Sequence, residues 1–303
     1  MVGLSERSKC DAAAMSTPSP RPRWNLLLKI GLALILVSVV LLAWKVRRAQ
    51  LGPVEIKVEK FFSTGEANTL GMHFLPVPDT GLLFGATEVR VREFRLFVEA
   101  MARDWPAPDL ETSDDHPAVN VTWDDARDFC AWLTSVERER GSITPAQEYR
   151  LPTDTEWSRA AALTDESGHT PAERANSVQL VYVWGSAWPP PAGAGNFAGE
   201  EAQVDPSEPG AHIAGYRDAF PRLAPVGQFA PNRFGLYDLA GNALEWCEDW
   251  FSPAERGRVM RGGSWLNGDP QTLALGHRAE IPPRAGFDVT GFRCVLAPAR
   301  GER

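Results

Sequence analysis

The chain has 303 residues, enough for one or two domains, and its 44% hydrophobic and 23% charged residues are ordinary for a folded soluble domain. Residues 1–60 hold ten of the 31 Lys and Arg residues but only four of the 39 Asp and Glu residues, so residues 61–303 carry a formal net charge of −14. Contacts to phosphates need clustered Lys and Arg, so this acidic part argues against a nucleic-acid-binding function. Its charge suits divalent cations or basic ligands, or serves solubility alone.

Residues 1–23 are small, polar and contain several prolines, which predicts a short disordered tail. Residues 24–46 are expected to form a transmembrane helix around the hydrophobic run Leu26–Trp44, in which Lys29 is the one charged residue. Nineteen helical residues extend about 28 Å, close to the hydrocarbon thickness of a bilayer. A buried core helix is disfavoured because no polar stripe interrupts the run, and a cleaved signal peptide because the run is long and lacks a small-residue cleavage site. We therefore expect a single-pass membrane protein.

Basic residues flank the hydrophobic run on both sides, so charge alone leaves its direction across the membrane open. Residues 47–60 form a charged linker. Residues 61–298 read as one continuous domain without internal repeats.

Three segments of this domain are expected to be helical. Thr87–Met101 places four apolar side chains on one helical face, namely Val91, Phe94, Phe97 and Val98. Thr122–Arg138 opens with a threonine and two aspartates, which suits a helix N-terminus, and is expected to bury Ala126, Phe129, Cys130 and Leu133. Thr153–Ala162 starts with a Thr-x-x-Glu capping box. Beyond it the chain is rich in Gly, Pro, Asn and Trp, so loops and buried aromatic side chains are expected to hold this region together.

Several local patterns follow one another along the domain: EVRVREFRLFV, HPAVNVTWDDARDFCAWL, YRLPTDTEWSRAA, GAGNFAG, APVGQFAPNRFGLYDLAGNALEWCEDW, RVMRGGSW and GFRC. In this order and spacing they resemble the formylglycine-generating enzyme, or sulfatase-modifying factor, family over about residues 72–297. The resemblance implies an α+β fold with little regular secondary structure, related to C-type-lectin-like folds. The family includes oxidases, iron enzymes and proteins without known activity, so membership alone would leave the function open.

The GLYDLAGNALEW pattern carries the first candidate metal site. Asp238 and Glu245 are oxygen donors seven residues apart, with Gly241 allowing a sharp turn between them. Ca²⁺ takes six to eight oxygen ligands, although Asp238 and Asn242 could also merely cap turns. The resemblance implies two calcium sites that combine side-chain and backbone oxygens, one formed by Asp238, Gly241, Ala243 and Glu245 and one by Asn196, Phe197, Asp218 and Phe220.

The chain has four cysteines, of which Cys10 lies before the predicted membrane span. The resemblance implies a structural disulfide between Cys130 and Cys294, which would stabilise the domain by roughly 4–5 kcal/mol in the chain-entropy model. Two buried free thiols are the alternative. A disulfide would indicate an oxidising compartment and would therefore place the domain on the extracytoplasmic side of the membrane. Cys247, between two tryptophans, is expected to be a buried small apolar side chain.

The oxidase of the family binds copper through two cysteines beyond the GGS turn, and Cu(I) needs soft thiolates. Aligned on GGS, these positions are Asn267 and Thr272 here, so both thiols are missing and copper is not expected. Ser264 and Arg278 match positions of the substrate or oxygen pocket of the family, which leaves a cleft. His277, beside Arg278, is the one histidine of interest, with an ordinary surface or hydrogen-bonded histidine as the alternative. The ligand pattern of the iron enzymes (His-x-x-x-His-x-Glu), a serine–histidine motif and a phosphate loop are absent.

Two functions remain. We favour a calcium-stabilised, non-oxidase binding or scaffolding module that one helix tethers to a membrane and that recognises a peptide or glycan in an aromatic cleft, lined by Trp184, Trp188, Trp265 and residues 189–191. The alternative is an oxidase of the formylglycine-generating type, which matures sulfatases by converting cysteine to formylglycine, or another metal-dependent oxidase with a non-standard site. Metal content and oxygen uptake separate the two. The sequence names neither the ligand nor the oligomeric state.

Overall fold

The computed structural model describes residues 67–106, 112–176, 179–202 and 212–299. All of them belong to the second of two compact units of the chain, Lys57–Arg303. Within these ranges no helix is both long and apolar enough to cross a bilayer. The predicted tail, transmembrane helix and linker, residues 1–23, 24–46 and 47–60, lie outside the described residues, so the membrane anchor stays a prediction.

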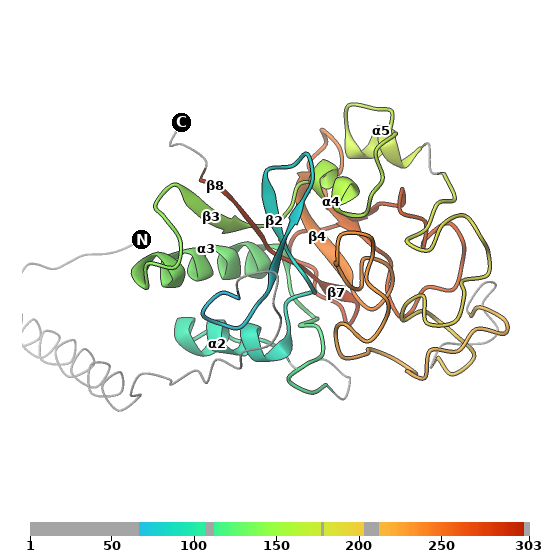
Figure 1. The fold of residues 1–303 in the computed structure, drawn as a ribbon, viewed down its shortest axis with the longest axis horizontal. Coiled ribbons are helices and arrows are strands. Elements are labelled where there is room, and N and C mark those ends of the chain that lie inside the picture. The colour runs from blue at the N-terminus through green and yellow to red at the C-terminus, as the bar shows by residue number, and fades with distance from the viewer. Residues whose placement is uncertain (1–66, 107–111, 177–178, 203–211, 300–303) are drawn as a thin grey trace, which may run out of the picture. The chain divides into compact units, whose positions relative to one another are not determined.

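The described part is a mixed α+β fold with two four-stranded sheets, as Figure 1 shows. The first sheet has the order β1-β2-β8-β3 and is antiparallel throughout. It is formed by β1 (Phe74–Val77), β2 (Leu82–Gly85), β3 (Gln147–Arg150) and β8 (Val295–Pro298). The predicted α+β class is therefore confirmed, whereas the relation to C-type-lectin-like folds stays a prediction.

The second sheet has the order β6-β5-β4-β7. It is antiparallel except between β4 and β7, which are parallel. Its strands are β4 (Leu244–Trp250), β5 (Arg258–Arg261), β6 (Ala279–Ile281) and β7 (Thr290–Gly291). The candidate site lies around this sheet, because β4 and the residues before it carry the GLYDLAGNALEW pattern.

The described helices are α2 (Val91–Met101), α3 (Trp123–Glu139), α4 (Asp154–Ala160) and α5 (Pro171–Ala175). Thr122 caps α3 by accepting a hydrogen bond from the Asp125 amide, and Thr153 caps α4 in a reciprocal capping box with Glu156. Both predicted helix starts are therefore confirmed. The short helix α5 was not foreseen, although Thr170, Pro171 and Glu173 form a further capping box at its start.

The start predicted for the first helix was wrong. The helix α2 begins at Val91 rather than near Thr87. The Val89 amide donates to the Phe292 carbonyl, and the Val89 carbonyl accepts from the Ala118 amide. These long-range backbone bonds draw the residues before Val91 into extended structure, against their helical spacing. As a consequence, Glu88 is buried in the core instead of lying on a helix surface.

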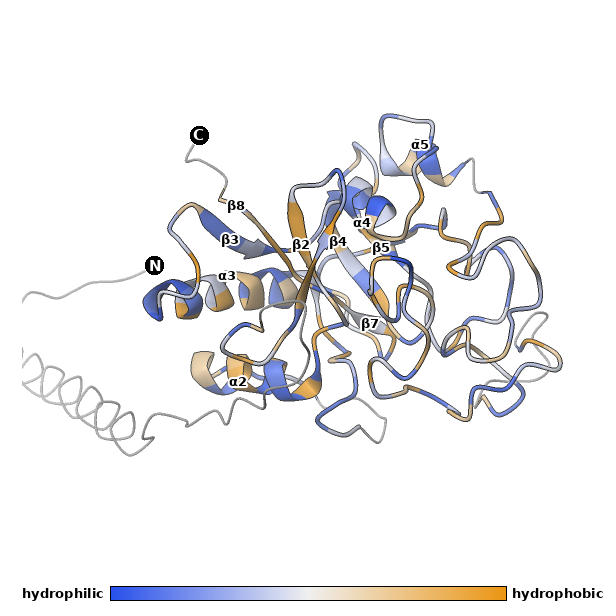
Figure 2. Ribbon diagram, in the orientation of Figure 1, coloured by the Kyte–Doolittle hydropathy of each residue, from blue (hydrophilic) through white to orange (hydrophobic). Residues whose placement is uncertain are grey.

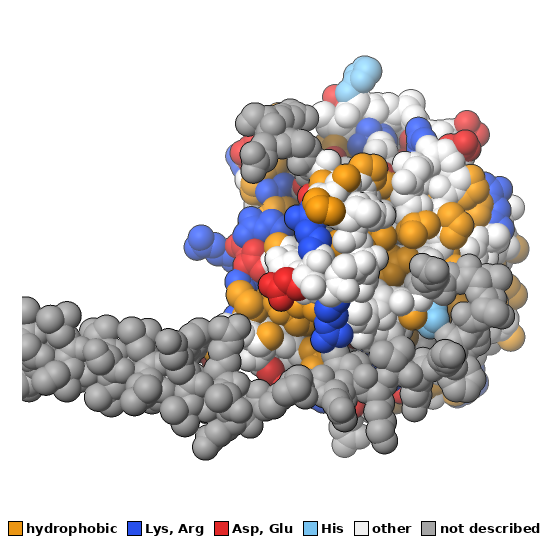
Figure 3. Space-filling view, turned by 60° about the vertical axis from the view of Figure 1, so that its left-hand side comes forward, with side chains coloured by type: hydrophobic (Ala, Val, Ile, Leu, Met, Phe, Trp, Pro, Cys, Tyr) orange, Lys and Arg blue, Asp and Glu red, His pale blue; other side chains and the backbone are white. Residues whose placement is uncertain are grey.

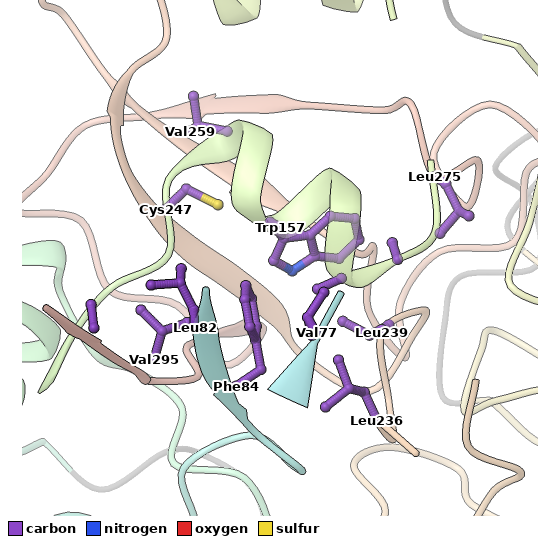
Figure 4. Close-up of a cluster of buried hydrophobic side chains, with 13 residues drawn as sticks. Val77, Leu82, Phe84, Trp157, Leu236, Leu239, Cys247, Val259, Leu275 and Val295 are labelled. Atoms are coloured by element: carbon purple, nitrogen blue, oxygen red, sulfur yellow. The ribbon is translucent and has the colours of Figure 1, made fainter. Parts of the chain in front are cut away.

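A hydrophobic core joins the first sheet, α4 and the loops before β4. Its centre is Trp157 of α4, which is fully buried together with Phe84 of β2. Figure 4 shows these two side chains converging with aliphatic side chains from β1, β5 and β8. Figure 2 shows β2 as largely hydrophobic, whereas α2 and α3 alternate between hydrophobic and polar residues. Burial of this cluster is what holds the loop-rich half against the first sheet.

The helices α2 and α3 pack through aromatic rings. Phe129 of α3 lies with its ring centroid 5.8 Å from that of Phe94 and 5.4 Å from that of Phe292. The residues predicted to line the inner faces of these helices are buried, apart from Val98, which is half-buried. On the face that Figure 3 shows, Lys and Arg side chains lie beside Asp and Glu side chains with apolar side chains between them.

Candidate functional site

A cluster of buried carboxylates surrounds one guanidinium at the start of β4. Both oxygens of Glu245 accept hydrogen bonds from Arg293, and Glu245 Oε2 also accepts from Trp157 Nε1 at 2.7 Å. Asp238 Oδ2 accepts from the Gly227 amide at 2.7 Å, while Asp238 Oδ1 is buried without a hydrogen-bond partner. The structure therefore brings the predicted ligands Asp238 and Glu245 into one buried cluster, with Glu245 already paired.

Glu88 is a third carboxylate in this cluster, which the sequence did not single out. Burial, followed by the charges of Asp238 and Glu245, raises the pKa of Glu88 well above its usual value. Burial likewise raises the pKa of Asp238 to about 6, in spite of the Gly227 amide and the Arg293 charge. Three carboxyl groups around one guanidinium therefore favour their neutral forms more than usual, and a bound cation would stabilise their ionised forms.

The second predicted metal site is a cradle around Asn196 and Asp218. The Asp218 carboxylate accepts hydrogen bonds from the Phe197 and Phe220 amides, both at 2.9 Å. Asn196 is fully buried, and its Oδ1 has no partner. Burial raises the pKa of Asp218 to about 6, and the nearby Glu201 adds to this. The structure thus places the four predicted ligands Asn196, Phe197, Asp218 and Phe220 next to one another.

The two predicted calcium sites fit a hard cation to different degrees. Among the described residues, no three Asp, Glu, His or Cys side chains are grouped as a metal cluster. The cradle does not need one, since its donors would be a buried amide oxygen, one carboxylate and backbone carbonyls, which are calcium ligands. The unpartnered Asn196 Oδ1 makes the cradle a good fit. The Asp238 site fits only in part, because Arg293 already neutralises Glu245.

The segment after β5 forms a compact turn at the positions where the family oxidase has its thiols. Asn267 Oδ1 accepts hydrogen bonds from the amide and the hydroxyl of Ser264, at 2.8 and 2.9 Å. The Thr272 hydroxyl donates to the Asp269 carboxylate, which also accepts from the Thr272 amide. A Cβ atom placed on Gly263 would lie 3.2 Å from the Thr272 carbonyl oxygen and 3.6 Å from Asn267 Oδ1. The two positions therefore converge, but their side chains stabilise the turn itself.

Arg278, a predicted cleft residue, is buried in a second ionic network. Its Nε donates to both oxygens of Asp154, at 2.9 and 3.0 Å, and it also pairs with Glu166 at 2.7 Å. Arg174 and Arg261 bind the same Asp154 carboxylate. Since the side chains of Arg278 and Asp154 are fully buried, the geometry gives Arg278 a structural position that ties its segment to α4.

His277 and Tyr182 carry buried polar atoms without partners among the described residues. These atoms are His277 Nδ1 and the Tyr182 hydroxyl oxygen. Burial lowers the pKa of His277, partly offset by Asp269, and burial with the Asp269 charge raises the pKa of Tyr182. Asp269 therefore acts on both groups electrostatically.

The predicted aromatic lining of the cleft is divided between surface and core. Tyr182 and Trp184 are stacked with ring centroids 4.7 Å apart, and Trp188 lies 5.6 Å from Tyr182 and is 37% exposed. Trp265, in contrast, is buried at 6% exposure. Of residues 189–191, the outer two prolines are exposed and the middle one is buried. An aromatic surface for a ligand therefore consists of Trp184 and Trp188 rather than Trp265.

Cys130 and Cys294 lie side by side in the core, as the resemblance implied. Their sulfurs are 3.3 Å apart, and in this structure both are free thiols. The disulfide bond itself stays a prediction. Cys247 is fully buried, and burial raises the pKa of its thiol well above the usual value. It therefore lies in the core, as expected for a small apolar side chain.

Several residues that organise the site were not identified as site residues from the sequence. Glu88, Arg293, Asn242, Asp154 and Arg261 are all fully or almost fully buried polar residues. Each lies inside one of the quoted patterns, respectively EVRVREF, GFRC, GLYDLAGN, RLPTD and RVMRGG. A polar residue within an otherwise apolar or glycine-rich pattern was the available signal, but a pattern does not reveal which charges meet.

A family model described as "Sulfatase-modifying factor enzyme 1-like domain" matches residues 62–298. The chain is 32% identical over 203 residues to a Bos taurus protein named "Inactive C-alpha-formylglycine-generating enzyme 2", covering 64% of this chain and 55% of the relative. The Mus musculus protein of the same name is 34% identical over 61% of this chain and 50% of its own length. The chain thus spans about half the length of these curated relatives.

More distant matches include a named enzyme and a solved structure. A Thermomonospora curvata protein named "Formylglycine-generating enzyme" is 29% identical, over 65% of this chain and 61% of the relative. The solved structure of Treponema denticola variable protein 1 matches with a TM-score of 0.47 and 23% identity, covering 75% of this chain and 92% of that chain. A likeness this low carries no argument about function.

Proposed function

Because the chain belongs to the family of sulfatase-modifying factor enzyme 1-like domains, we propose that it is a membrane-anchored, calcium-stabilised binding module without copper-oxidase activity. The observation that carries this proposal is the chemistry of positions 267 and 272. Asn267 and Thr272 offer neutral oxygen and nitrogen groups that bond within their own turn, whereas Cu(I) needs thiolates. The mammalian relatives that are named as inactive enzymes support the same conclusion.

Calcium would be held first in the cradle. Its donors would be Asn196, Phe197, Asp218 and Phe220, and the support for this site is the buried, unpartnered Asn196 Oδ1. A second ion would use Asp238, Gly241, Ala243 and Glu245, where the support is the unpartnered Asp238 Oδ1. A bound calcium ion would supply a fixed positive charge that neutralises buried carboxylates and ties together the loops that carry its ligands.

The ligand of the module would be a peptide or a glycan that stacks on the exposed aromatic surface. Trp188 is one of few large apolar side chains that the described residues expose, and it lies against the stacked pair of Tyr182 and Trp184. Exposed aromatic rings contribute large apolar area at low cost in side-chain entropy. The acidic domain would favour a neutral or basic ligand over an anionic one.

The second candidate function is an oxidase that uses a non-standard metal arrangement. It is favoured only by the buried His277 Nδ1 and Tyr182 hydroxyl, which lack partners beside Asp269. Sulfatase maturation by conversion of cysteine to formylglycine would be its reaction. One imidazole and one phenol are poor copper ligands compared with two thiolates.

Metal analysis combined with an oxygen-uptake assay on cysteine-containing sulfatase peptides separates the two candidates. We expect the purified chain to bind calcium, to contain no stoichiometric copper or iron, and to consume no oxygen. The matched control is the double variant Asn267→Cys/Thr272→Cys, which should gain Cu(I) binding because the two positions converge at Gly263. Stoichiometric copper or iron in the unaltered chain, together with oxygen uptake, would instead establish the oxidase.

The disulfide and the side of the membrane form a further part of the proposal. We expect Cys130 and Cys294 to be bonded and the domain to be extracytoplasmic, since their sulfurs are already adjacent. Thiol alkylation of the denatured protein without reductant should then modify Cys10 and Cys247 but neither of the pair, and all four cysteines after reduction. Alkylation of Cys130 and Cys294 without reductant would contradict the disulfide and reopen the orientation.

A further inference from the structure

Three segments that are distant in the sequence meet at Asn242. The Asn242 amide donates to the Asn196 carbonyl at 2.9 Å, and the Asn242 carbonyl accepts from the Trp265 amide at 2.9 Å. The Ala198 amide donates to the Asn267 carbonyl at 3.0 Å, which closes the arrangement. The turn of residues 264–267, which we call the cleft turn, therefore rests directly on the loop that forms the cation cradle.

Both the nitrogen and the oxygen of the Asn242 side-chain amide form buried hydrogen bonds. Its Nδ2 donates to Glu88 Oε2 at 2.8 Å, and its Oδ1 accepts from Asn196 Nδ2 at 2.9 Å and from the Ala224 amide at 3.0 Å. Asn242 is fully buried and has a φ of +58°, a conformation that asparagine tolerates better than most residues. Its position is thus determined by packing and by hydrogen bonds on both sides.

Asn242 also decides which way the Asn196 amide points. Asn196 Nδ2 donates to Asn242 Oδ1 and to the Arg222 carbonyl, both at 2.9 Å. With the amide nitrogen held on that side, Asn196 Oδ1 is left facing the other way, buried and without a partner. A side-chain amide can present either its oxygen or its nitrogen, so a fixed partner for the nitrogen is what presents the oxygen to a cation.

We propose that Asn242 is a positioning residue that couples a calcium ion bound in the cradle to the cleft turn, so that calcium orders residues 264–267. The inference rests on the calcium part of the proposed function and adds its regulation. An ion that fixes Asn196 also fixes Asn242, and through the Asn242 carbonyl and the Asn267 carbonyl it limits the motion of the cleft turn. Binding that orders a shared segment lowers the entropic cost of a second ligand there, which is positive coupling.

The test is hydrogen–deuterium exchange of the peptide that covers residues 262–273, with and without calcium chloride, alongside a calcium titration of the same samples. In the unaltered chain, calcium should slow exchange of the cleft-turn amides about tenfold, within the usual range of coupling between two sites. In Asn242→Asp, a carboxylate oxygen replaces the donor to Glu88 Oε2, and repulsion between the two carboxylates should displace the side chain that accepts from Asn196 Nδ2. The calcium effect on the cleft turn should then be lost. The double variant Glu88→Gln/Asn242→Asp restores a donor–acceptor pair and should restore the effect.

Asn232→Ala is the matched structural control. The Asn232 side chain bonds the Ala160 carbonyl and the Phe234 and Leu236 amides but none of the predicted cation ligands. It should therefore lower stability and keep the calcium effect on the cleft turn. If Asn242→Asp does not fold, Asn242→Gly replaces it, because glycine adopts a positive φ without strain.

The outcomes keep the two proposals apart. Absence of calcium binding in the unaltered chain would overturn the calcium part of the proposed function. Calcium binding without slower exchange in the cleft turn, or an unchanged calcium effect in Asn242→Asp, would overturn the coupling and leave calcium binding in place. A rescued double variant with an unaffected Asn232→Ala supports the coupling.

Discussion

Replacing Gly241 with alanine is expected to destabilise the domain by about 4 kcal/mol, a large part of the stability of an ordinary domain. Gly241 has a φ of +80°, a backbone conformation that strains every other residue, although asparagine and aspartate are strained less. A Cβ atom would also lie 2.1 Å from the Asn196 carbonyl oxygen and 2.7 Å from the Phe197 ring. Neither neighbour can retreat easily, because both are fully buried. Urea-induced unfolding followed by tryptophan fluorescence measures the loss.

Gly71→Ala separates the two causes of this effect. Gly71 has a similar φ of +76°, but a Cβ atom there would have no heavy atom within 4 Å. Its replacement should cost only the conformational strain, about 1–2 kcal/mol. Equal losses for Gly71→Ala and Gly241→Ala would contradict the close packing of the Asp238–Glu245 turn on the cradle. Because Gly241 packs on a cradle residue, Gly241→Ala should also weaken calcium binding, whereas Gly71→Ala should not.

Removing the Arg278 side chain is expected to cost about 3–5 kcal/mol, because it leaves buried carboxylate groups without one of their partners. Arg278 pairs with Asp154 at 2.9 Å and with Glu166 at 2.7 Å, and its own side chain and that of Asp154 have no exposure to solvent. Chemical unfolding of Arg278→Ala measures the change. The matched control is Arg95→Ala, since Arg95 and Asp114 pair at 2.7 Å but are 48% and 59% exposed. That exposed pair should contribute less than about 1 kcal/mol.

The loss of folding stability at low pH, the acid limb of a plot of unfolding free energy against pH, tests the same network. Burial alone would raise the pKa of Asp154, but the charges of Arg261 and Arg278 outweigh it and lower the pKa below its usual value. A lowered folded-state pKa means that the stability from ionised Asp154 is fully present above the unfolded-state pKa of about 3.9 and is lost as the pH falls through the lower folded-state value. In Arg278→Ala this acid limb should be shallower. A loss below 1 kcal/mol with an unchanged acid limb would show that Arg278 is not needed to neutralise Asp154.

Patterns of local origin could be read correctly from the sequence. The capping residues Thr122 and Thr153 were predictable because a cap is formed within four residues. The inner face of α3 was predictable because helical spacing decides which side chains share a face. The start of α2 was not, because Val89 forms backbone bonds with Phe292 and Ala118, which no local pattern contains.

The candidate site divides in the same way. The identities of Asn196 and Asp218 already indicate which oxygen ligands the cradle offers. The identities of Asn267 and Thr272 show that both copper-binding thiols are missing. Only the folded structure shows that Asn196 Oδ1 is buried without a partner and that Glu245 is paired with Arg293. Arg278 is the clearest example of what the sequence does not reveal. Its position in the family pattern predicted a cleft residue, whereas its ion pair with Asp154 lies in a buried network.

The sequence by itself determined the family, the α+β class, the helix caps and the absence of cysteines at positions 267 and 272, because each depends on which residues stand next to one another along the chain. Only the tertiary structure decided which buried charges meet, that Asn242 joins the cradle to the cleft turn, and that Trp188 rather than Trp265 faces solvent. These outcomes depend on contacts between residues that are tens to hundreds of positions apart. Their energies arise from burial and pairing in three dimensions, which spacing along the chain does not encode.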